Sequence, residues 1–443
     1  MSSSPEENIA KVLLVVEAFL GGFYVSITRG LFIPMISYSG YSLGNMALIL
    51  LPTGLSGSIL SLILYRYSDS LTRKFKFLAF TTHVTERVVW FLLPFLLGNI
   101  ELISFTYMLG NLISAVVSIF IGALIYSYFS SIQDVINVSV WRSAAGAVAS
   151  LLGSLFMTFV SYVYNPPQSY IISYFAAFVI GLGSSLAFIL VPKFPSQIVE
   201  KQQETPVEVI VRGHSAFLVL TFMLAGSNLV GLSWTPFLKS LGAPIYIALA
   251  LSVTGNIGGT LGSFLFRGYK SYMVGLVANT LLTGLIPFIS YPYAHVGISF
   301  FTSLTFMAAN LLAMQIFAEV NARMGRIKAS AFLVAGNYTG LLIASMVAYI
   351  FVKDPFTGLI LSAIIKFLAV IIVLLAIPET AIIPGRKAYE FSRLIYSISL
   401  TGFTFTVQAS KEFLKTFFEA VTLMTLALLL YIIYKLAFLI IGG

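Results

Sequence analysis

The longest polar stretch in this 443-residue chain is KFPSQIVEKQQETPVEVIVR, from Lys193 to Arg212. On both sides of it the sequence consists of apolar blocks of about 20 to 28 residues, which are separated by short polar links. An α-helix needs about 20 apolar residues to cross the hydrocarbon core of a bilayer. Lys193–Arg212 therefore interrupts a series of membrane-spanning helices, and we predict an all-α polytopic membrane protein.

The composition supports this class. Apolar residues make up 58% of the chain and charged residues 9%, whereas a soluble domain has about 25% charged residues. The first apolar block is longer than the apolar region of a signal peptide and lacks a small-x-small cleavage site, so we expect it to remain as the first span.

Twelve spans are predicted from apolar blocks that end at charged residues, Gly or Pro. They are Ile9–Ile36, Leu43–Tyr65, Phe77–Leu97, Ile103–Tyr128, Ser143–Tyr164, Tyr170–Val191, His214–Leu238, Ala243–Phe266, Tyr272–Ser290, Ala294–Phe317, Ala329–Val352 and Gly358–Ile377. Six precede the polar stretch and six follow it, which predicts two six-helix bundles. Both halves also contain Asn-x4-Arg, at Asn137–Arg142 and at Asn321–Arg326.

These spans divide the chain into four regions. We predict an N-terminal bundle (1–192), a cytoplasmic central loop (193–212), a C-terminal bundle (213–380) and a C-terminal extension (381–443). In the extension, Thr416–Ile441 is apolar enough to add one further transmembrane helix, while Phe391–Val407 either lies in the membrane interface or crosses it. The expected fold is thus a twelve-helix core with about one extra span.

The distribution of basic residues predicts the orientation, because short basic loops stay in the cytoplasm. With the N-terminus inside, external links hold only Lys239 and Lys353, and cytoplasmic links hold seventeen basic residues: Lys11, Arg66, Arg73, Lys74, Lys76, Arg142, Lys193, Lys201, Arg212, Arg267, Lys270, Arg323, Arg326, Lys328, Arg386, Lys387 and Arg393. This asymmetry explains the net charge of +9 without a nucleic-acid partner. We expect a multi-pass protein of the plasma membrane.

No cofactor or metal is expected. The chain has no cysteine, and its three histidines, His83, His214 and His295, are isolated in sequence, whereas metal sites need several ligands. No Gly-rich loop followed by Lys-Ser or Lys-Thr is present for phosphate binding.

The link after the second span carries a family resemblance. It reads Tyr65-Arg-Tyr-Ser-Asp69-Ser-Leu-Thr-Arg73-Lys74 and resembles the signature loop of the major facilitator superfamily, a glycine followed by Asp-Arg-x-Gly-Arg-Arg. Asp69, Arg73 and Lys74 are in register, and the departures are Tyr65, Ser70 and Thr72. Pro378-Glu379-Thr380 is similar to the family's common ending of the twelfth span, so the resemblance covers roughly Ile9 to Thr380.

The resemblance implies two bundles that rock about a central site and open it alternately to each side. It also implies a gate at this loop, for which Asp69, Arg73, Lys74 and Arg142 are the candidates. A carboxylate among cations can form charge-assisted hydrogen bonds in one state and release them in the other. The alternative is that Arg73 and Lys74 only set the topology and that Asp69 is a solvated acid.

Ionisable residues also occur inside predicted spans, where each needs a partner or a hydrated cavity. His83, Glu86 and Arg87 share one helix face, and we interpret them as structural charges that hold the first bundle together. Lys366 in the twelfth span is expected to pair locally or to extend toward the interface.

In the resembled family the first, fourth, seventh and tenth helices line the cavity, and here each carries a polar stripe. The expected cavity residues are Glu17, Tyr24, Arg29, Asn111, Ser118, Asn228, Trp234, Asn310 and Gln315. Arg29 would recognise an anion, or it only extends to the outer interface, and Glu17 would titrate. The alternative is that these small and polar residues pack the helices together.

The resulting hypothesis is a secondary transporter of a small organic solute, without enzymatic activity, that works by alternating access in the lipid bilayer. It would be proton-coupled if Glu17 or Glu86 titrates. The alternatives are another multi-helix carrier or flippase, or a membrane enzyme or assembly platform. An enzyme would be expected to show clustered acids or histidines at a loop, and the external links are short and nearly uncharged.

Overall fold

The apolar blocks fold into helices that end at turn residues or capping side chains. The structure, a computed structural model, describes residues 5–66, 75–129, 132–192, 207–324 and 326–376. Gly40 and Gly98, with φ of 94° and 105°, lie in the turns after the first and third helices of the chain, because glycine reaches positive φ without a steric penalty. Asn99 caps the next helix by accepting a hydrogen bond from the Leu102 amide.

Twelve α-helices and two short 3-10 helices make up the described residues. The first half contains α1 (Pro5–Tyr38), α2 (Leu43–Arg66), α4 (Phe75–Leu92), η1 (Leu93–Leu96), α5 (Ile100–Tyr128), α6 (Ile132–Val163) and α7 (Gln168–Ile189). The second contains α8 (Val207–Ser240), α9 (Ile245–Leu265), α10 (Tyr269–Leu285), η2 (Ile286–Phe288), α11 (Ala294–Met324), α12 (Arg326–Phe351) and α13 (Pro355–Ala376). We refer to α1–α7 as the N set and to α8–α13 as the C set.

The helices have the length and surface of membrane spans. Eleven described helices are long and apolar enough to cross a bilayer, and the twelfth, α4, carries three charged residues, Lys76, Glu86 and Arg87, within its 18 residues. Large apolar side chains cover the outside of the assembly, for example Phe159 of α6 and Phe175 of α7, which are 65% and 55% exposed. The prediction of an all-α polytopic membrane protein is confirmed.

Several helices extend beyond the predicted spans, and two of them do so markedly at their starts. Helix α6 begins at Ile132, before the predicted Ser143, and α8 begins at Val207, inside the predicted central loop. In both cases the helix continues beyond the apolar block into polar residues, because the block marks the hydrocarbon and not the helix end. Residues 193–206 of the predicted central loop and the C-terminal extension, with Phe391–Val407 and Thr416–Ile441, lie outside the described residues.

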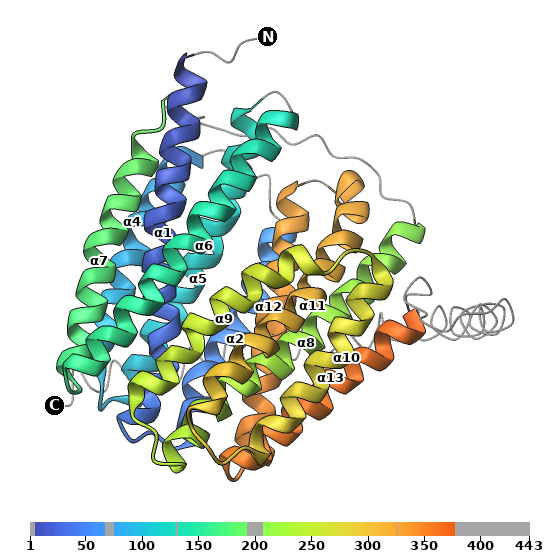
Figure 1. Cartoon of the computed structure of the whole chain (residues 1–443). Coiled ribbons are helices and arrows are strands. Elements are labelled where there is room, and N and C mark those ends of the chain that lie inside the picture. The colour runs from blue at the N-terminus through green and yellow to red at the C-terminus, as the bar shows by residue number, and fades with distance from the viewer. Residues whose placement is uncertain (1–4, 67–74, 130–131, 193–206, 325, 377–443) are drawn as a thin grey trace, which may run out of the picture.

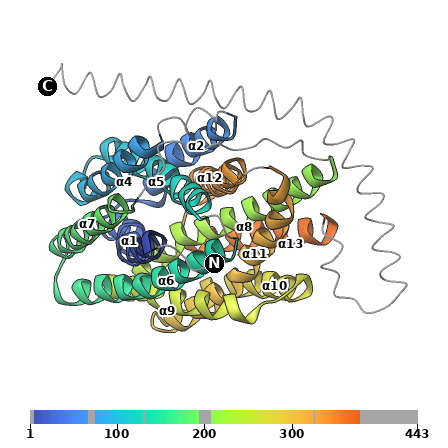
Figure 2. The ribbon, with the colours of Figure 1, turned by 90° about the horizontal axis from the view of Figure 1, so that it is seen from above.

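The two sets lie side by side and touch along specific helix pairs. Figure 1 shows α1, α4, α6 and α7 on one side and α8, α10, α11 and α13 on the other. Across the junction α2 packs on α12 and α6 packs on α9, and Figure 2 shows α2 next to α12 from above. Gly54 allows the first contact, because a Cβ at that position would lie 2.6 Å from the Leu342 Cα.

One cluster of fully buried apolar residues is shared by the two sets. This cluster contains Met35 and Ile36 of α1 together with Leu249 of α9 and Val352 of α12. A second cluster has all its buried members in the N set, around Ala10, and a third has all of them in the C set. The sets therefore share buried core residues toward the end where α1 finishes at Tyr38 (the Tyr38 end). Toward the end where α1 begins (the Pro5 end) their buried residues form separate clusters, and the partly buried Val334 of α12 packs against the cluster of the N set.

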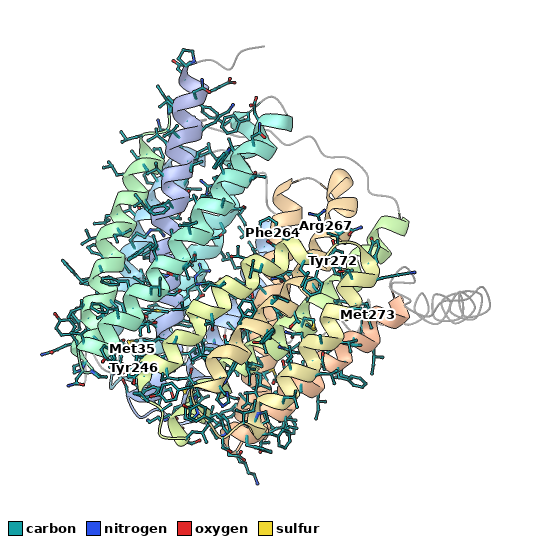
Figure 3. All side chains as sticks on the ribbon, viewed as in Figure 1. Met35, Tyr246, Phe264, Arg267, Tyr272 and Met273 are labelled. Atoms are coloured by element: carbon teal, nitrogen blue, oxygen red, sulfur yellow. The ribbon has the colours of Figure 1, made fainter. Side chains whose placement is uncertain are left out.

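Polar contacts close the Tyr38 end. The Tyr38 hydroxyl donates to the carbonyl of Ala243 at 2.6 Å, and Lys239 Nζ donates to the carbonyl of Ser37 at 2.9 Å. Figure 3 labels Met35 and Tyr246 at this end, whereas Phe264 and Arg267 lie at the opposite end of α9. Each set thus donates a side-chain hydrogen bond to a main-chain carbonyl oxygen of the other set.

Candidate functional site

The inner part of α1 exposes a single side chain. From Leu20 to Tyr38 every residue is buried or partly buried except Arg29, which is exposed. The large apolar residues that α1 exposes end at Phe19, so this part of the helix is surrounded by protein. Arg29 is therefore exposed to a space inside the assembly and not to the outer, lipid-facing surface.

Helices α5 and α8 show the same pattern. Between Leu102 and Phe129, Ser118 is the only exposed residue among those whose burial is described, and between Phe217 and Leu238 the only one is Gly231. None of the exposed large apolar residues belongs to these two segments. Solvent thus reaches polar or small residues on three enclosed helices, α1, α5 and α8, two from the N set and one from the C set.

Aromatic side chains from both sets surround Arg29. The hydroxyls of Tyr24, Tyr107 and Tyr338, from α1, α5 and α12, lie within electrostatic range of its guanidinium. A Cβ added at the neighbouring Gly30 would lie 3.7 Å from Ser252 Oγ of α9 in the C set. The Tyr107 ring stacks on Phe32 with 4.0 Å between centroids. Arg29 therefore lies at the junction of the two sets, and no ion pair to it occurs in the described part of the chain.

Tyr338 connects the sets beside Arg29. Its hydroxyl donates to the main-chain carbonyl of Asn111 at 2.6 Å, while the Asn111 amide donates to the carbonyl of Tyr107. The Tyr338 ring lies against Gly57 of α2, where an added Cβ would come within 2.2 Å of it. One tyrosine of the C set is thus held between two helices of the N set.

Glu17 lies in a buried ionic network within the N set. Arg142 Nη1 is 2.6 Å from Glu17 Oε2, and His83 Nε2 is 3.4 Å from Glu17 Oε1. The same Arg142 nitrogen donates to the carbonyl of Leu14, and Glu17 Oε2 has no aligned hydrogen bond, so the Glu17–Arg142 contact is an ion pair. Glu17 is 3% exposed and His83 1%; the expected cavity position of Glu17 stays a prediction.

The rest of this network fixes α4 against its neighbours. Arg87 pairs with Glu86, and Glu86 accepts a short hydrogen bond from Ser114 of α5. The Arg87 guanidinium lies 4.2 Å from the Tyr24 ring centroid, and the Tyr24 hydroxyl donates to the carbonyl of Glu86. Tyr24 is 1% exposed. Two acids and two arginines are therefore paired inside the N set.

Lys366 is the buried cation of the C set. It is 3% exposed, and its Nζ donates to Thr283 Oγ1 of α10 at 2.9 Å and lies 5.9 Å from the Phe306 ring of α11. No carboxylate in the described residues pairs with it. The bond to Thr283 is local, within one helix set.

The remaining predicted cavity residues lie in the C set. Trp234 is buried, and its indole N–H donates to His295 Nδ1 at 2.9 Å. Asn228, Asn310 and Gln315 are partly buried, and Asn228 Nδ2 has no hydrogen-bond partner in the described part of the chain. Of the predicted gate, Asp69, Arg73 and Lys74 lie outside the described residues, and Arg142 is the partner of Glu17.

Sequence reasoning missed Tyr338 and the pairing of Trp234 with His295. Tyr338 lies in the eleventh span, outside the four helices that the resemblance pointed to. A tyrosine in the middle of an apolar span was the available signal, because a buried hydroxyl needs a hydrogen-bond partner.

Comparison with known proteins defines the class. No family model matches the chain, and no curated protein matches it. Among solved structures, a bacterial homologue of the human lysosomal transporter Spinster, inward-facing and unoccupied, superposes with a TM-score of 0.61 at 12% identity, over 85% of this chain and 98% of that one. A mutant of the nucleoside transporter NupG superposes with a TM-score of 0.63 at 14% identity, over 82% of this chain and 98% of that one. NupG itself superposes with a TM-score of 0.54 at 16% identity, over 83% of this chain and 97% of that one. The chain is a multi-pass membrane protein that shares the fold of these solved transporter structures.

Proposed function

We propose that the chain is a secondary active transporter of a small organic solute that works by alternating access. The observation that carries this proposal is the asymmetry of the junction: the sets share fully buried core residues at the Tyr38 end, whereas at the Pro5 end their fully buried residues form separate clusters. Such an arrangement suits two bodies that tilt past each other, because packed interfaces switch between discrete arrangements. Residues 1–192 and 213–380 would be these bodies.

The asymmetry of the basic links supports a plasma-membrane protein whose N-terminus is in the cytoplasm. With this orientation the Tyr38 end, which side-chain contacts close, would face outward, and the space beside Arg29 and Ser118 would open toward the cytoplasm. The solute would reach Arg29 from the Pro5 end and leave at the other after the contacts of Tyr38 and Lys239 have broken.

Coupling and gating follow from the charges of the N set. Glu17 would bind a proton in one state and release it in the other, because opening the space to water changes the hydration of a buried carboxylate. Its partners Arg142 and His83 would change with it. Asp69, Arg73 and Lys74 would form the gate. The substitution Glu17→Gln should then remove the pH dependence of transport, and an unchanged dependence would exclude Glu17 as the proton site.

The lack of cysteine allows a direct test of alternating access. Ser118→Cys and Met35→Cys each introduce one thiol, the first exposed and the second 0% exposed at the closed end. In oriented vesicles, an impermeant thiol reagent should label Ser118→Cys from the cytoplasmic side. The same reagent should label Met35→Cys only from the other side and more slowly, at the rate at which that end opens.

The labelling rates separate a transporter from the alternatives. A solute that is carried should change the two rates in opposite directions, because it shifts the population between the two states. A static membrane enzyme or assembly platform predicts that Met35→Cys stays unreactive from both sides while Ser118→Cys reacts. Ser290→Cys, at an exposed position in the short link between η2 and α11, is the control whose rate should not change.

A further inference from the structure

Arg29 carries a charge that no described carboxylate neutralises. It precedes Tyr38 by nine residues, which places its Cα about 13 Å along the helix from the closed end. A charged side chain at this depth needs a partner or water. The exposure of Arg29 shows that it has water, in a space that three helices of the N and C sets enclose.

The charges around it are already paired. Glu17 pairs with Arg142, and Glu86 pairs with Arg87. In the described part of the chain, these are the only two acids buried within the N set. Arg29 is thus one positive charge in excess, and it is the exposed cation of this group, whereas Arg142 is partly buried and Arg87 is buried.

The groups that face Arg29 suit an organic anion. Phe32, three residues after Arg29 on α1, stacks on Tyr107 of α5, and Tyr338 of α12 donates to the carbonyl of Asn111, one turn from Tyr107. A guanidinium forms paired hydrogen bonds with carboxylate or phosphate oxygens, and aromatic rings pack against a flat apolar body. A solute with both parts would contact the N set and the C set at once.

We propose that Arg29, with Tyr107 and Tyr338, forms the recognition site for a small organic oxyanion that bears a ring. This inference rests on the proposed function for the role of the site, but the site itself does not require transport. Because Tyr338 belongs to the C set and Arg29 to the N set, the bound anion contributes to the closure of the junction between them.

Thiol labelling near Arg29 measures the electrostatic effect of its guanidinium. Asn111→Cys places the only thiol of the full chain one helical turn from Tyr107, and the carbonyl that accepts from Tyr338 is retained. The measured quantity is the ratio of labelling rates for an anionic and a cationic methanethiosulfonate reagent of similar size. An exposed guanidinium attracts the anionic reagent, so Arg29→Gln should lower the ratio about tenfold, and Arg29→Lys should keep it near that of the parent.

Two controls accompany this test. At Ser118→Cys, seven residues further along α5 and so about 10 Å away, Arg29→Gln should change the ratio less than at Asn111→Cys. Thermal unfolding of each variant shows whether it is folded. A ratio at Asn111→Cys that is the same with Arg29 and with Arg29→Gln in folded protein overturns the proposal.

Competition identifies the anion class. Benzoate and phenyl phosphate are the probes, with benzamide as the uncharged control of the same shape as benzoate. Slower labelling of Asn111→Cys with benzoate alone assigns a carboxylate, and slower labelling with phenyl phosphate alone assigns a phosphate; either effect should vanish with Arg29→Gln. Protection by benzamide equal to that by benzoate, or no protection by either anion, contradicts the proposal. These outcomes do not depend on whether Met35→Cys becomes accessible, so a failure of alternating access remains distinguishable.

Discussion

The Tyr338 hydroxyl of α12 lies 2.6 Å from the main-chain carbonyl of Asn111 in α5, and this hydrogen bond joins the two helix sets beside Arg29. Tyr338 is 6% exposed, so water could not readily take the place of its hydroxyl as the donor to the Asn111 carbonyl. The bond links the proposed anion site to the contact between α2 and α12, because the same ring packs against Gly57.

Tyr338→Phe tests this link. The ring keeps its packing and only the hydroxyl is lost, which leaves the Asn111 carbonyl without its donor. We expect the free energy of unfolding in detergent to fall by about 1 kcal/mol. Tyr349→Phe on the same helix is the control, because Tyr349 is 54% exposed and its loss should change stability by less than about 0.5 kcal/mol. Equal effects would show that the hydrogen bond contributes nothing specific.

Gly54→Ala tests the close approach of α2 and α12. Inside a helix, replacing Gly by Ala ordinarily stabilises by up to about 1 kcal/mol. At Gly54 the new Cβ would meet Leu342 main-chain atoms at 2.6 Å, so we expect a loss of about 1 to 3 kcal/mol from overpacking. The unfolding temperature of the purified variant, compared with that of the parent, shows whether the substitution stabilises or destabilises the protein.

Gly122→Ala is the matched control for this substitution. Gly122 lies inside α5, and nothing lies within 4 Å of a Cβ added there, so the variant should be as stable as the parent or more stable. If both glycine variants changed stability in the same direction, the α2–α12 contact would not depend on the small residue.

Spans and helix ends differ in how well the sequence predicts them. Hydropathy located all the helices that the structure describes, because burial in lipid requires a long apolar block. It placed the start of α6 at Ser143 instead of Ile132, since Gln133 and Asp134 are polar. The extra turns are held by tertiary contacts that no local pattern contains, such as the 2.6 Å ion pair of Asp134 with Lys11.

The candidate site was less accessible to sequence reasoning. The sequence points to Arg29, Ser118 and Glu17 because polar residues inside membrane spans are costly. It does not predict which residues surround them. Arg142 pairs with Glu17, 125 positions away along the chain, and Arg29 has no such partner in the described part. Which acid meets which base depends on how helices distant in sequence pack together.

Glu17→Gln tests whether the N-set network is structural. Removing one partner of a buried ion pair leaves the other charge uncompensated, so we expect a loss of about 3 kcal/mol in the free energy of unfolding. A double-mutant cycle with Arg142→Gln should give a large coupling between the two sites. Asp134→Asn breaks the pair with Lys11, whose side chains are 31% and 24% exposed, and should cost less than about 1 kcal/mol. A Glu17→Gln loss as small as the control would contradict the structural role.

The pH dependence of stability has a local test at Asp354, outside the membrane spans. Asp354 caps α13: its Oδ1 accepts from the Thr357 amide at 2.9 Å and its Oδ2 from the Thr357 hydroxyl at 2.7 Å. These hydrogen bonds to the carboxylate lower the pKa of Asp354 from its ordinary value of 3.8. A group whose pKa is lower in the folded state stabilises fully above its unfolded pKa, and this contribution is lost as the pH falls through the folded pKa.

Two substitutions at this position separate the cap from the charge. Asp354→Ala removes the acceptor and should cost about 1 kcal/mol at pH 7, with the difference from the parent shrinking as the pH falls below 3.8. Asp354→Asn keeps an acceptor that does not titrate, so it should retain most of the stability at pH 7. Because neither Asn nor Ala titrates, both variants should gain on the parent by the same amount as the pH falls, and Asp354→Asn should become at least as stable as the parent in acid. Unfolding temperatures measured in detergent from pH 7 down to about pH 3 give both curves, with the window set by the carboxyl pKa. If Asp354→Ala differed from the parent by the same amount at every pH, the carboxylate would not be the group that caps α13.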